Sequence, residues 1–253
     1  MSSTATPADV LAGNARWCVV EGDAMTVLAS MPAASVDATA SDPPYGTGQW
    51  QRAEPGAGAD CRAAHRVEEW DVWDPEWIDH ALRISRGPVL SYVPNGRIEE
   101  MLARGRVASL ATRVLLWCKT DPRPRFSGQP AYGFEPVIAY RALSGGEVDW
   151  CAASAPRMNR DRDATGHPHQ KPVEVDRWLV RLATKRNDVV FVPHGGSGTA
   201  GEAALAEGRR VILCERVPEY ADIARRRCAS ADAGHNHRAP AEQFGFNFGG
   251  GAK

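Results

Sequence analysis

The fold is decided by residues 188–215, whose sequence is DVVFVPHGGSGTAGEAALAEGRRVILCE. An apolar run ends at a glycine-rich turn, a helix-forming segment follows, and a second apolar run ends at Glu215. This order of strand, turn, helix and strand is typical of a nucleotide-binding half-unit. Gly196 and Gly198 allow a tight turn and a close approach of the backbone to a ligand, and the helix from Thr199 would direct its free N–H groups at that ligand.

The acid at the end of the second apolar run supports this interpretation. Glu215 lies 17 residues beyond Gly198, where a carboxylate can accept hydrogen bonds from both hydroxyls of a ribose. The turn lacks the Gly-Lys-Ser/Thr of an NTPase phosphate loop, which argues against NTP hydrolysis. Glycine also favours plain packing of a helix on a strand, so the turn alone leaves ligand binding open.

Strand and helix alternate over most of the chain around this unit. Apolar segments predict seven strands, around residues 17–20, 36–41, 88–93, 112–118, 135–141, 188–192 and 210–214. Amphipathic segments between them predict helices, among them one with Asp74 as N-cap and Pro75 in its first turn. The sequence therefore predicts an α/β fold with a seven-stranded, mostly parallel sheet covered by helices on both faces.

This alternation predicts one domain, over residues 16–228, with flexible parts. Residues 1–15 are small and polar, and residues 229–253 are rich in Gly, Ala and His without a period, so we expect a flexible N-terminus and a flexible C-terminal tail. Residues 47–74 mix Gly, Pro, Ala and charged residues, which predicts a mobile loop within the domain.

The composition is that of an ordinary globular protein. The 253 residues are 43% hydrophobic and 24% charged, with a net charge of −1, which excludes small disulfide-rich and fibrous proteins. The six cysteines form no CxxC pair, so we expect buried, reduced thiols and no metal site. No apolar run approaches the roughly 18 residues that span a bilayer, and we expect a cytoplasmic protein that does not act at a membrane.

A second motif, Asp42-Pro43-Pro44-Tyr45, directly follows a predicted strand. Two successive prolines fix the backbone and remove two N–H donors, so carbonyl oxygens at the turn face outward. The carboxylate of Asp42 and the carbonyl of Pro43 can together accept both hydrogens of an exocyclic amino group, and Tyr45 offers a flat face to a planar base. Taken alone, the motif also fits a proline turn with an N-cap aspartate.

The chain resembles the DNA amino-methyltransferase family in four motifs, which are DPPY at 42–45, GHPHQKP at 166–172, GGSGTAGEAA at 195–204 and ILCE at 212–215. Members of this family transfer a methyl group from S-adenosylmethionine to adenine N6 or cytosine N4 in DNA. In the permuted (β-type) members, DPPY precedes the glycine motif, as it does here. The resemblance covers about residues 17–227 and implies a Rossmann-like class I methyltransferase fold with a circularly permuted motif order.

The resemblance assigns roles to these positions. Asp42 and Pro43, with Pro44 in the same turn, would bind the target amino group, and Tyr45 would stack on the base. S-adenosylmethionine would lie against the glycine turn, the HPxQKP element and two acids, with Glu215 at the ribose and Asp23 near the adenine. The cofactor residues implied in this way are Asp23, His167, Gln170, Lys171, Pro193, Gly196, Ser197, Gly198, Thr199 and Glu215. Without the neighbouring motifs, His167 and His169 would be surface residues of a turn.

The glycine turn departs from the family at its first residue. Members commonly have Asp-Pro-Phe before the turn, whereas this chain has Val192-Pro193-His194. The carboxylate that would pair with the ammonium of the cofactor is missing, and we expect another acid, such as Asp188 or one from the 47–74 loop, to replace it. The segments WCK at 117–119 and FEP at 134–136 are weaker matches to two further family elements.

The resemblance implies a site-specific methyltransferase that acts by direct in-line transfer on a base flipped out of double-stranded DNA. Adenine N6 is the expected target, since cytosine N4 enzymes more often have Ser in place of the Asp of DPPY. We expect small target-recognition insertions within 120–172, and their small size implies a short target site or recognition by a homodimer. The expected DNA contacts are Arg52, Arg123, Arg125, Arg157 and Arg160, with a solvated surface as the alternative.

Other functions stay open at this point. Methylation of cytosine N4, RNA or a protein amide would use similar chemistry, and a degenerate protein would bind S-adenosylmethionine and DNA without transfer. A dehydrogenase is disfavoured because it gives DPPY no role. The family also implies a link to restriction–modification, although nothing in the sequence identifies a companion restriction enzyme.

Overall fold

The computed structural model describes residues 5–46, 71–108, 110–120, 133–141 and 170–235. Its centre is a seven-stranded sheet with the strand order β1-β7-β6-β2-β3-β5-β4. The strands are β1 (Trp17–Glu21), β2 (Ala38–Ser41), β3 (Val89–Tyr92), β4 (Thr112–Cys118), β5 (Phe134–Tyr140), β6 (Val189–Val192) and β7 (Arg210–Glu215). Each coincides with a strand predicted from the sequence, which confirms the expected sheet.

The sheet is parallel except at one strand. β1, β7, β6, β2 and β3 are parallel neighbours, whereas β5 runs antiparallel to both β3 and β4. The carboxyl ends of the parallel strands therefore meet at one edge. Because β5 is reversed, its amino end lies at the same edge, beside the carboxyl end of β4.

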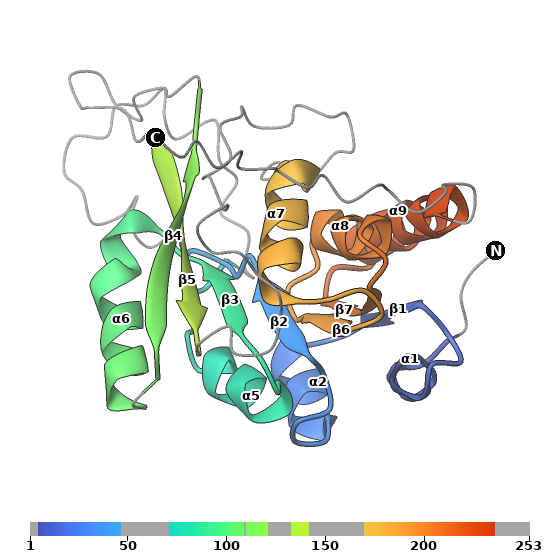
Figure 1. The fold of residues 1–253 in the computed structure, drawn as a ribbon, viewed down its shortest axis with the longest axis horizontal. Helices are drawn as coiled ribbons and strands as arrows, with labels where there is room; N and C mark the ends of the chain where they lie inside the picture. Colours follow the sequence, from blue (N-terminus) through green and yellow to red (C-terminus); the bar gives the residue numbers. More distant parts are fainter. Residues whose placement is uncertain (1–4, 47–70, 109, 121–132, 142–169, 236–253) are drawn as a thin grey trace, which may run out of the picture.

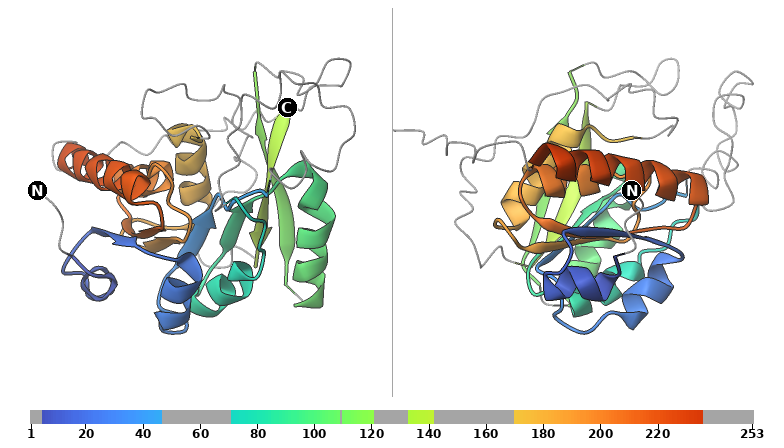
Figure 2. Two further views of the ribbon diagram at one scale, coloured as in Figure 1. Left: turned by 180° about the vertical axis from the view of Figure 1, so that it is seen from behind. Right: turned by 90° about the vertical axis from the view of Figure 1, so that its right-hand side faces the viewer.

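Helices cover both faces of the sheet (Figures 1 and 2). One layer contains α1 (Pro7–Ala12), α2 (Ala24–Ser30), α5 (Trp77–Ile84), the 3-10 helix η1 (Asn95–Arg97) and α6 (Ile98–Val107), and the other contains α7 (Val173–Ala183), α8 (Thr199–Ala206) and α9 (Pro218–His235). In β6, Val190 and Val192 pack on the α7–α9 side, whereas Val189 and Phe191 pack on the α2–α5 side. Successive side chains of a strand point to opposite faces, so one short apolar run fills two cores.

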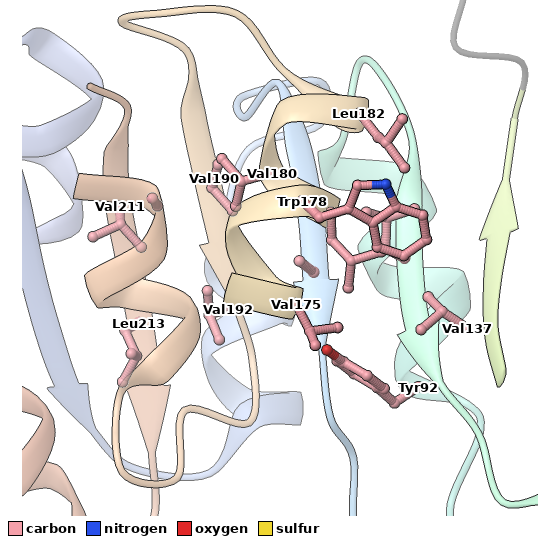
Figure 3. Close-up of a cluster of buried hydrophobic side chains, with 14 of the residues drawn as sticks. Tyr92, Val137, Val175, Trp178, Val180, Leu182, Val190, Val192, Val211 and Leu213 are labelled. Atoms are coloured by element: carbon pink, nitrogen blue, oxygen red, sulfur yellow. The ribbon is translucent and has the colours of Figure 1, made fainter. Parts of the chain in front are cut away.

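Helix α7 covers the middle of the sheet. Its residues Val175, Leu179 and Leu182 are buried, as their helical spacing predicts. Val175 belongs to one buried cluster with Val192 of β6 and Tyr92 of β3 (Figure 3). Burial of each such aliphatic side chain stabilises the fold by roughly 1.5–3 kcal/mol, which fixes the start of α7 over the strand ends.

The ordered domain is wider than the predicted 16–228. Residues 7–12, which were expected to be flexible, form α1, with a capping box between Thr6 and Asp9 and a buried Val10. At the other end, α9 continues to His235, past the predicted start of the tail at residue 229. Both errors have one cause, since these short segments of small residues carry too few large apolar side chains to show a helical period.

Helix α5 begins later than predicted. It starts at Trp77 with Glu76 as N-cap, while Asp74 accepts a hydrogen bond from the N–H of Glu76 (2.9 Å). The indole N–H of Trp73 donates to Glu100 of α6 (3.2 Å), so the last residues of the predicted 47–74 loop are held against this helix. Residues 47–70 lie outside the described residues, as do residues 121–132 and 142–169 of the predicted recognition insertions.

The described residues include no helix that is long and apolar enough to cross a membrane. They contain no group of three His, Cys, Asp or Glu side chains that could hold a metal ion. Cys18, Cys214 and Cys228 are buried free thiols, as predicted, and Cys118 is a half-buried free thiol.

Candidate active site at the carboxyl edge of the sheet

The predicted motifs meet at the edge where the parallel strands end. β1 leads to Asp23, β7 ends at Glu215, β6 leads to the glycine turn and β2 leads to the DPPY motif. The reversed β5 contributes Glu135, which pairs with Lys119 at the end of β4. Open α/β sheets bind ligands at this edge, so the topology itself gathers the candidate residues.

The glycine turn connects β6 tightly to α8. Gly196 and Gly198 have φ angles of 50° and 85°, which residues with a Cβ rarely adopt. A Cβ at Gly198 would also lie 2.7 Å from the Cα of Ala224 in α9. The turn therefore needs glycine, and it presents the amino end of α8, where N–H groups lack partners within the helix.

Two acids flank this turn. Glu215 is 8% exposed, and its carboxylate accepts hydrogen bonds from the N–H groups of Gly196 (2.7 Å) and Val217 (2.8 Å). Burial raises the pKa of Glu215, and these backbone donors oppose the rise. Asp23 is exposed and caps α2 by accepting from the N–H of Thr26 (3.1 Å). β1 pairs with β7 in register, so the two acids lie at neighbouring strand ends.

The HPxQKP element reaches the glycine turn through its glutamine. Gln170 is 7% exposed, and its Oε1 accepts a hydrogen bond from the hydroxyl of Ser197 (3.1 Å). The structure thus brings these two predicted cofactor residues together. Pro193 is buried before the turn, and Thr199 is buried at the first position of α8, whereas His167 lies outside the described residues.

The DPPY motif follows β2, as predicted. Its far end is held by a hydrogen bond from the N–H of Gly46 to Asp71 (2.8 Å). The side chain of Asp42 is 29% exposed, yet its Oδ1 is buried and has no hydrogen-bond partner in the part of the chain that the structure describes. A buried acceptor without a partner is costly, so this oxygen is available to a further donor.

Lys171 lies at the DPPY motif. Its ammonium is 3.2 Å from Oδ2 of Asp42, 3.0 Å from Oε2 of Glu135 and 3.4 Å from the hydroxyl of Tyr45. It also lies 5.0 Å from the ring centroid of Tyr45 and 5.1 Å from that of Tyr92, which is within the range of cation–π attraction. The resemblance assigned Lys171 to the cofactor, and contacts with the target-binding motif were not anticipated.

Lys119 extends this contact into an alternating row of charges. It lies 2.6 Å from Oε1 of Glu135, so each oxygen of that carboxylate has a lysine partner. Burial alone would raise the pKa of Glu135, but Lys171 and Lys119 lower it to about 2. Burial alone would lower the pKa of Lys171, but Asp42 and Glu135 raise it well above its ordinary value. Burial raises the pKa of Asp42, and Lys171 opposes that rise.

A further buried acid lies on α7. Asp176 is 5% exposed and accepts hydrogen bonds from the hydroxyls of Tyr92 (3.0 Å) and Thr199. Burial raises its pKa to about 6. Sequence reasoning missed this residue, although a signal was present, because Asp176 is a charged side chain between Val175 and Leu179 on the apolar side of an amphipathic helix.

His194 connects two strand ends. Its Nδ1 lies 2.8 Å from the hydroxyl oxygen of Ser41, the residue before Asp42. Its ring meets Trp77 of α5 edge-on, with a centroid distance of 5.3 Å. Burial lowers the pKa of His194 to about 4, so the imidazole is neutral at neutral pH. The glycine turn and the DPPY motif are thereby linked by a polar contact that the motifs alone did not indicate.

The structure excludes Asp188, one of the expected replacements for the missing carboxylate, whereas the loop acids within 47–70 lie outside the described residues. Val192 is 1% exposed, inside the core. Asp188 precedes β6 and therefore lies at the opposite end of that strand from the glycine turn, where it accepts from the N–H of Lys185 (2.8 Å). It cannot reach a ligand at the turn. Asp176, which is bonded to Thr199, is an acid on the correct side.

The DNA contacts expected from the sequence are not part of this geometry. Arg52, Arg123, Arg125, Arg157 and Arg160 lie outside the described residues.

Comparisons with known sequences agree with the motifs. A family model described as DNA methylase, of the N6/N4 methyltransferase class, matches residues 144–226. The chain is 24% identical over 242 residues to the type II methyltransferase M.HinfI of Haemophilus influenzae, covering 83% of this chain and 67% of that protein. It is 26% identical over 220 residues to the methylase YubD of Escherichia coli (strain K12), covering 83% and 89% of the two chains.

Solved structures show the same fold. The M1.HpyAVI–SAM complex matches with a TM-score of 0.59 and 20% identity, over 83% of this chain and 99% of that one. The cytosine-N4-specific PvuII DNA methyltransferase matches with a TM-score of 0.60 and 16% identity, over 88% and 92% of the chains. The chain therefore shares the Rossmann-like fold of these class I methyltransferases. In its sequence relatives and in the order of its motifs on this sheet, the chain is similar to DNA methylases of the N6/N4 amino-methyltransferase family.

Proposed function

We propose that this protein transfers a methyl group from S-adenosylmethionine to the exocyclic N6 of adenine in DNA, on a base flipped out of the duplex. The observation that carries the proposal is the buried Oδ1 of Asp42, which has no hydrogen-bond partner among the described residues and lies at the end of the strand next to β6. This oxygen would accept from the target amino group, beside the turn that would hold the methyl donor. The family is S-adenosylmethionine-dependent, and M1.HpyAVI was solved as a complex with this molecule.

The residues present fit this cofactor. S-adenosylmethionine, when bound, supplies an electrophilic methyl group on its sulfonium. Glu215 would accept hydrogen bonds from the ribose hydroxyls and Asp23 would lie at the adenine, since these acids end neighbouring strands. The turn with Gly196 and Gly198 would receive the methionine end at the amino terminus of α8.

Asp176 is our candidate for the ammonium of the cofactor, in place of the acid absent at Val192. It is a buried carboxylate bonded to Thr199 at the end of the glycine turn. Asp176→Asn would weaken the binding of S-adenosylmethionine by roughly 10-fold or more, because a hydrogen bond to a charged group contributes about 1.5–3 kcal/mol. Binding of 5′-methylthioadenosine, which lacks the amino acid part, would stay unchanged in a calorimetric titration. An equal loss of affinity for S-adenosylmethionine and 5′-methylthioadenosine would refute this role.

The target side of the site would work by orientation and charge placement. Asp42 and the carbonyl of Pro43 would accept the two hydrogens of the amino group and aim the nitrogen lone pair at the methyl group. The base would stack on Tyr45, an interaction of roughly 1–3 kcal/mol. Flipping the base costs a few kcal/mol, which stacking and these hydrogen bonds would offset.

Adenine is proposed over cytosine because the acceptor is an aspartate in a DPPY motif. The fold does not make this choice, since the PvuII enzyme of similar fold is named as cytosine-N4-specific. The expected cytoplasmic location, the arginine contacts with DNA and the homodimer are likewise predictions that go with this proposal.

The test is transfer of a radiolabelled methyl group from S-adenosylmethionine to unmethylated DNA, followed by nucleoside analysis. Labelled N6-methyladenine that is absent with the Asp42→Ala variant supports the proposal. N4-methylcytosine would keep the mechanism and change the base. DNA retention without any transfer would favour the degenerate binding protein, and label on RNA or protein alone would refute a DNA substrate.

A further inference from the structure

Lys171 has a role at the target side of the site that its motif does not indicate. Its side chain is 10% exposed and its ammonium contacts Asp42, Glu135 and Tyr45. Long side chains lose much rotamer freedom when they are buried, and a buried ammonium needs strong partners. Lys171 is therefore a buried lysine held at three points beside the proposed acceptor.

The two carboxylate oxygens of Asp42 differ in their contacts. Lys171 lies 3.2 Å from Oδ2, whereas the buried Oδ1 lacks a hydrogen-bond partner within the described ranges. A carboxylate with one oxygen fixed by an ammonium cannot rotate freely, so the direction of the other oxygen is set. That other oxygen is the one left for the amino group of a target base.

Lys171 also acts on the stacking partner. Its ammonium lies 5.0 Å from the ring centroid of Tyr45 and 3.4 Å from the hydroxyl of the same residue. One cation thus holds both the acceptor and the aromatic ring of the DPPY motif. The ring of Tyr92 on β3, at 5.1 Å, supports the ammonium from the neighbouring strand.

We propose that Lys171 is the positioning residue of the target site, which holds Asp42 charged and aimed through Oδ2 so that Oδ1 receives the amino group. This inference rests on the proposed function. Glu135 is the second anchor, because Lys119 binds its Oε1 and leaves Oε2 for Lys171. The antiparallel pair β4 and β5 thereby contributes to a site built mainly from the parallel strands.

The charged groups around Asp42 determine how its protonation would change if Lys171 were removed. The groups that face Asp42 are Lys171, Tyr45, Glu135 of β5, Tyr92 of β3 and Asp176 of α7, and Lys119 beyond β4 pairs with Glu135. Without Lys171, Asp42 would still face the carboxyls of Glu135 and Asp176, while Lys119 is paired with Glu135. Asp42 would then take up a proton at a higher pH and lose an acceptor oxygen.

The first experiment is the pH profile of kcat/KM for methyl transfer to unmethylated DNA. We expect Lys171→Met to move the acidic limb of the profile to a pH about 1–3 units higher, with activity recovering at high pH. Lys171→Arg keeps the positive charge and should return the acidic limb most of the way to its original pH. Lys185→Met is the matched control, because Lys185 is exposed in the loop before β6, and its profile should equal that of the unaltered protein. The proposal would be overturned if Lys171→Met lowered kcat/KM by the same factor at every pH. It would also be overturned if the pH profile of Lys171→Met equalled that of Lys185→Met.

The second experiment does not depend on transfer. Lys171→Met should lower the melting temperature, and adding Asp42→Asn should recover part of that loss, since the buried carboxylate without a partner is gone. Lys185→Met with Asp42→Asn should be additive. Additivity of Lys171→Met with Asp42→Asn would contradict the pairing. Absence of methyl transfer by the unaltered protein would instead count against the proposed function. The melting temperatures of the single and double variants would still decide whether Lys171 keeps Asp42 ionised.

Discussion

At Asp176, burial sets the direction of a pH effect on stability. Its pKa is about 6 in the folded protein, against about 3.9 in an unfolded chain. The folded state therefore favours the protonated form, and the stability this residue contributes below about pH 4 is lost as the pH rises to about 6. Asp176→Asn cannot ionise, so its unfolding free energy relative to the unaltered protein should rise by at most about 3 kcal/mol between pH 4 and pH 7.

Urea unfolding at several pH values measures this difference. The other acids, including Glu135 with its lowered pKa, are present in both proteins, so their effects cancel in the comparison. A difference that does not change with pH would show that Asp176 has an ordinary pKa.

Two variants of Tyr45 distinguish the contribution of base stacking from that of the hydroxyl group. Tyr45→Ala should weaken DNA binding by roughly 5- to 150-fold, because base stacking on an aromatic ring is worth about 1–3 kcal/mol. Tyr45→Phe keeps the ring and loses the hydroxyl with its contacts to Lys171 and Asp42, so it should bind DNA nearly as tightly. Equilibrium binding to unmethylated DNA checks both variants, and an equal loss in the two would argue against stacking.

At the scale of elements, the glycine turn couples β6, α8 and α9. Gly198→Ala should destabilise the protein by on the order of 1–3 kcal/mol or more, because φ is 85° and the new Cβ would lie 2.7 Å from Ala224 of α9. Gly22→Ala is the control, since a Cβ at Gly22 meets nothing within 4 Å. Thermal melts that gave the same change for both variants would rule out this close approach as the reason for glycine.

The elements also show which features sequence patterns can predict. The apolar runs of β6 and β7 and the glycines between them are local signals, and the structure has them where the sequence predicts them. Contacts of Lys171, Asp176 and His194 are long-range, because they depend on how α7 and the turn cross the ends of β2 and β3. No periodicity within one segment carries that information, and the errors at α1 and α9 arose where the local signal itself was weak.

At the scale of the whole molecule, strand order explains why distant motifs form one site. The strands that lead to Asp23, Asp42, the glycine turn and Glu215 occupy four successive places in the sheet, β1, β7, β6 and β2. All four are parallel neighbours, so their carboxyl ends form one continuous edge. The order of the motifs along the chain therefore does not matter to the site, which is consistent with a permuted sequence.

Under the proposed function, this edge has two parts, a cofactor part at Glu215 and the glycine turn and a target part at Asp42. The most direct test compares Asp42→Asn and Glu215→Gln for S-adenosylmethionine affinity by calorimetry and for the methyl-transfer rate at saturating cofactor, with melting curves to confirm folding. Asp42→Asn should lower the rate by roughly 100-fold or more and leave affinity nearly unchanged. Glu215→Gln should weaken affinity by roughly 10- to 100-fold and retain most of the rate. If both variants changed the same quantity, the division of the site into these two parts would be wrong.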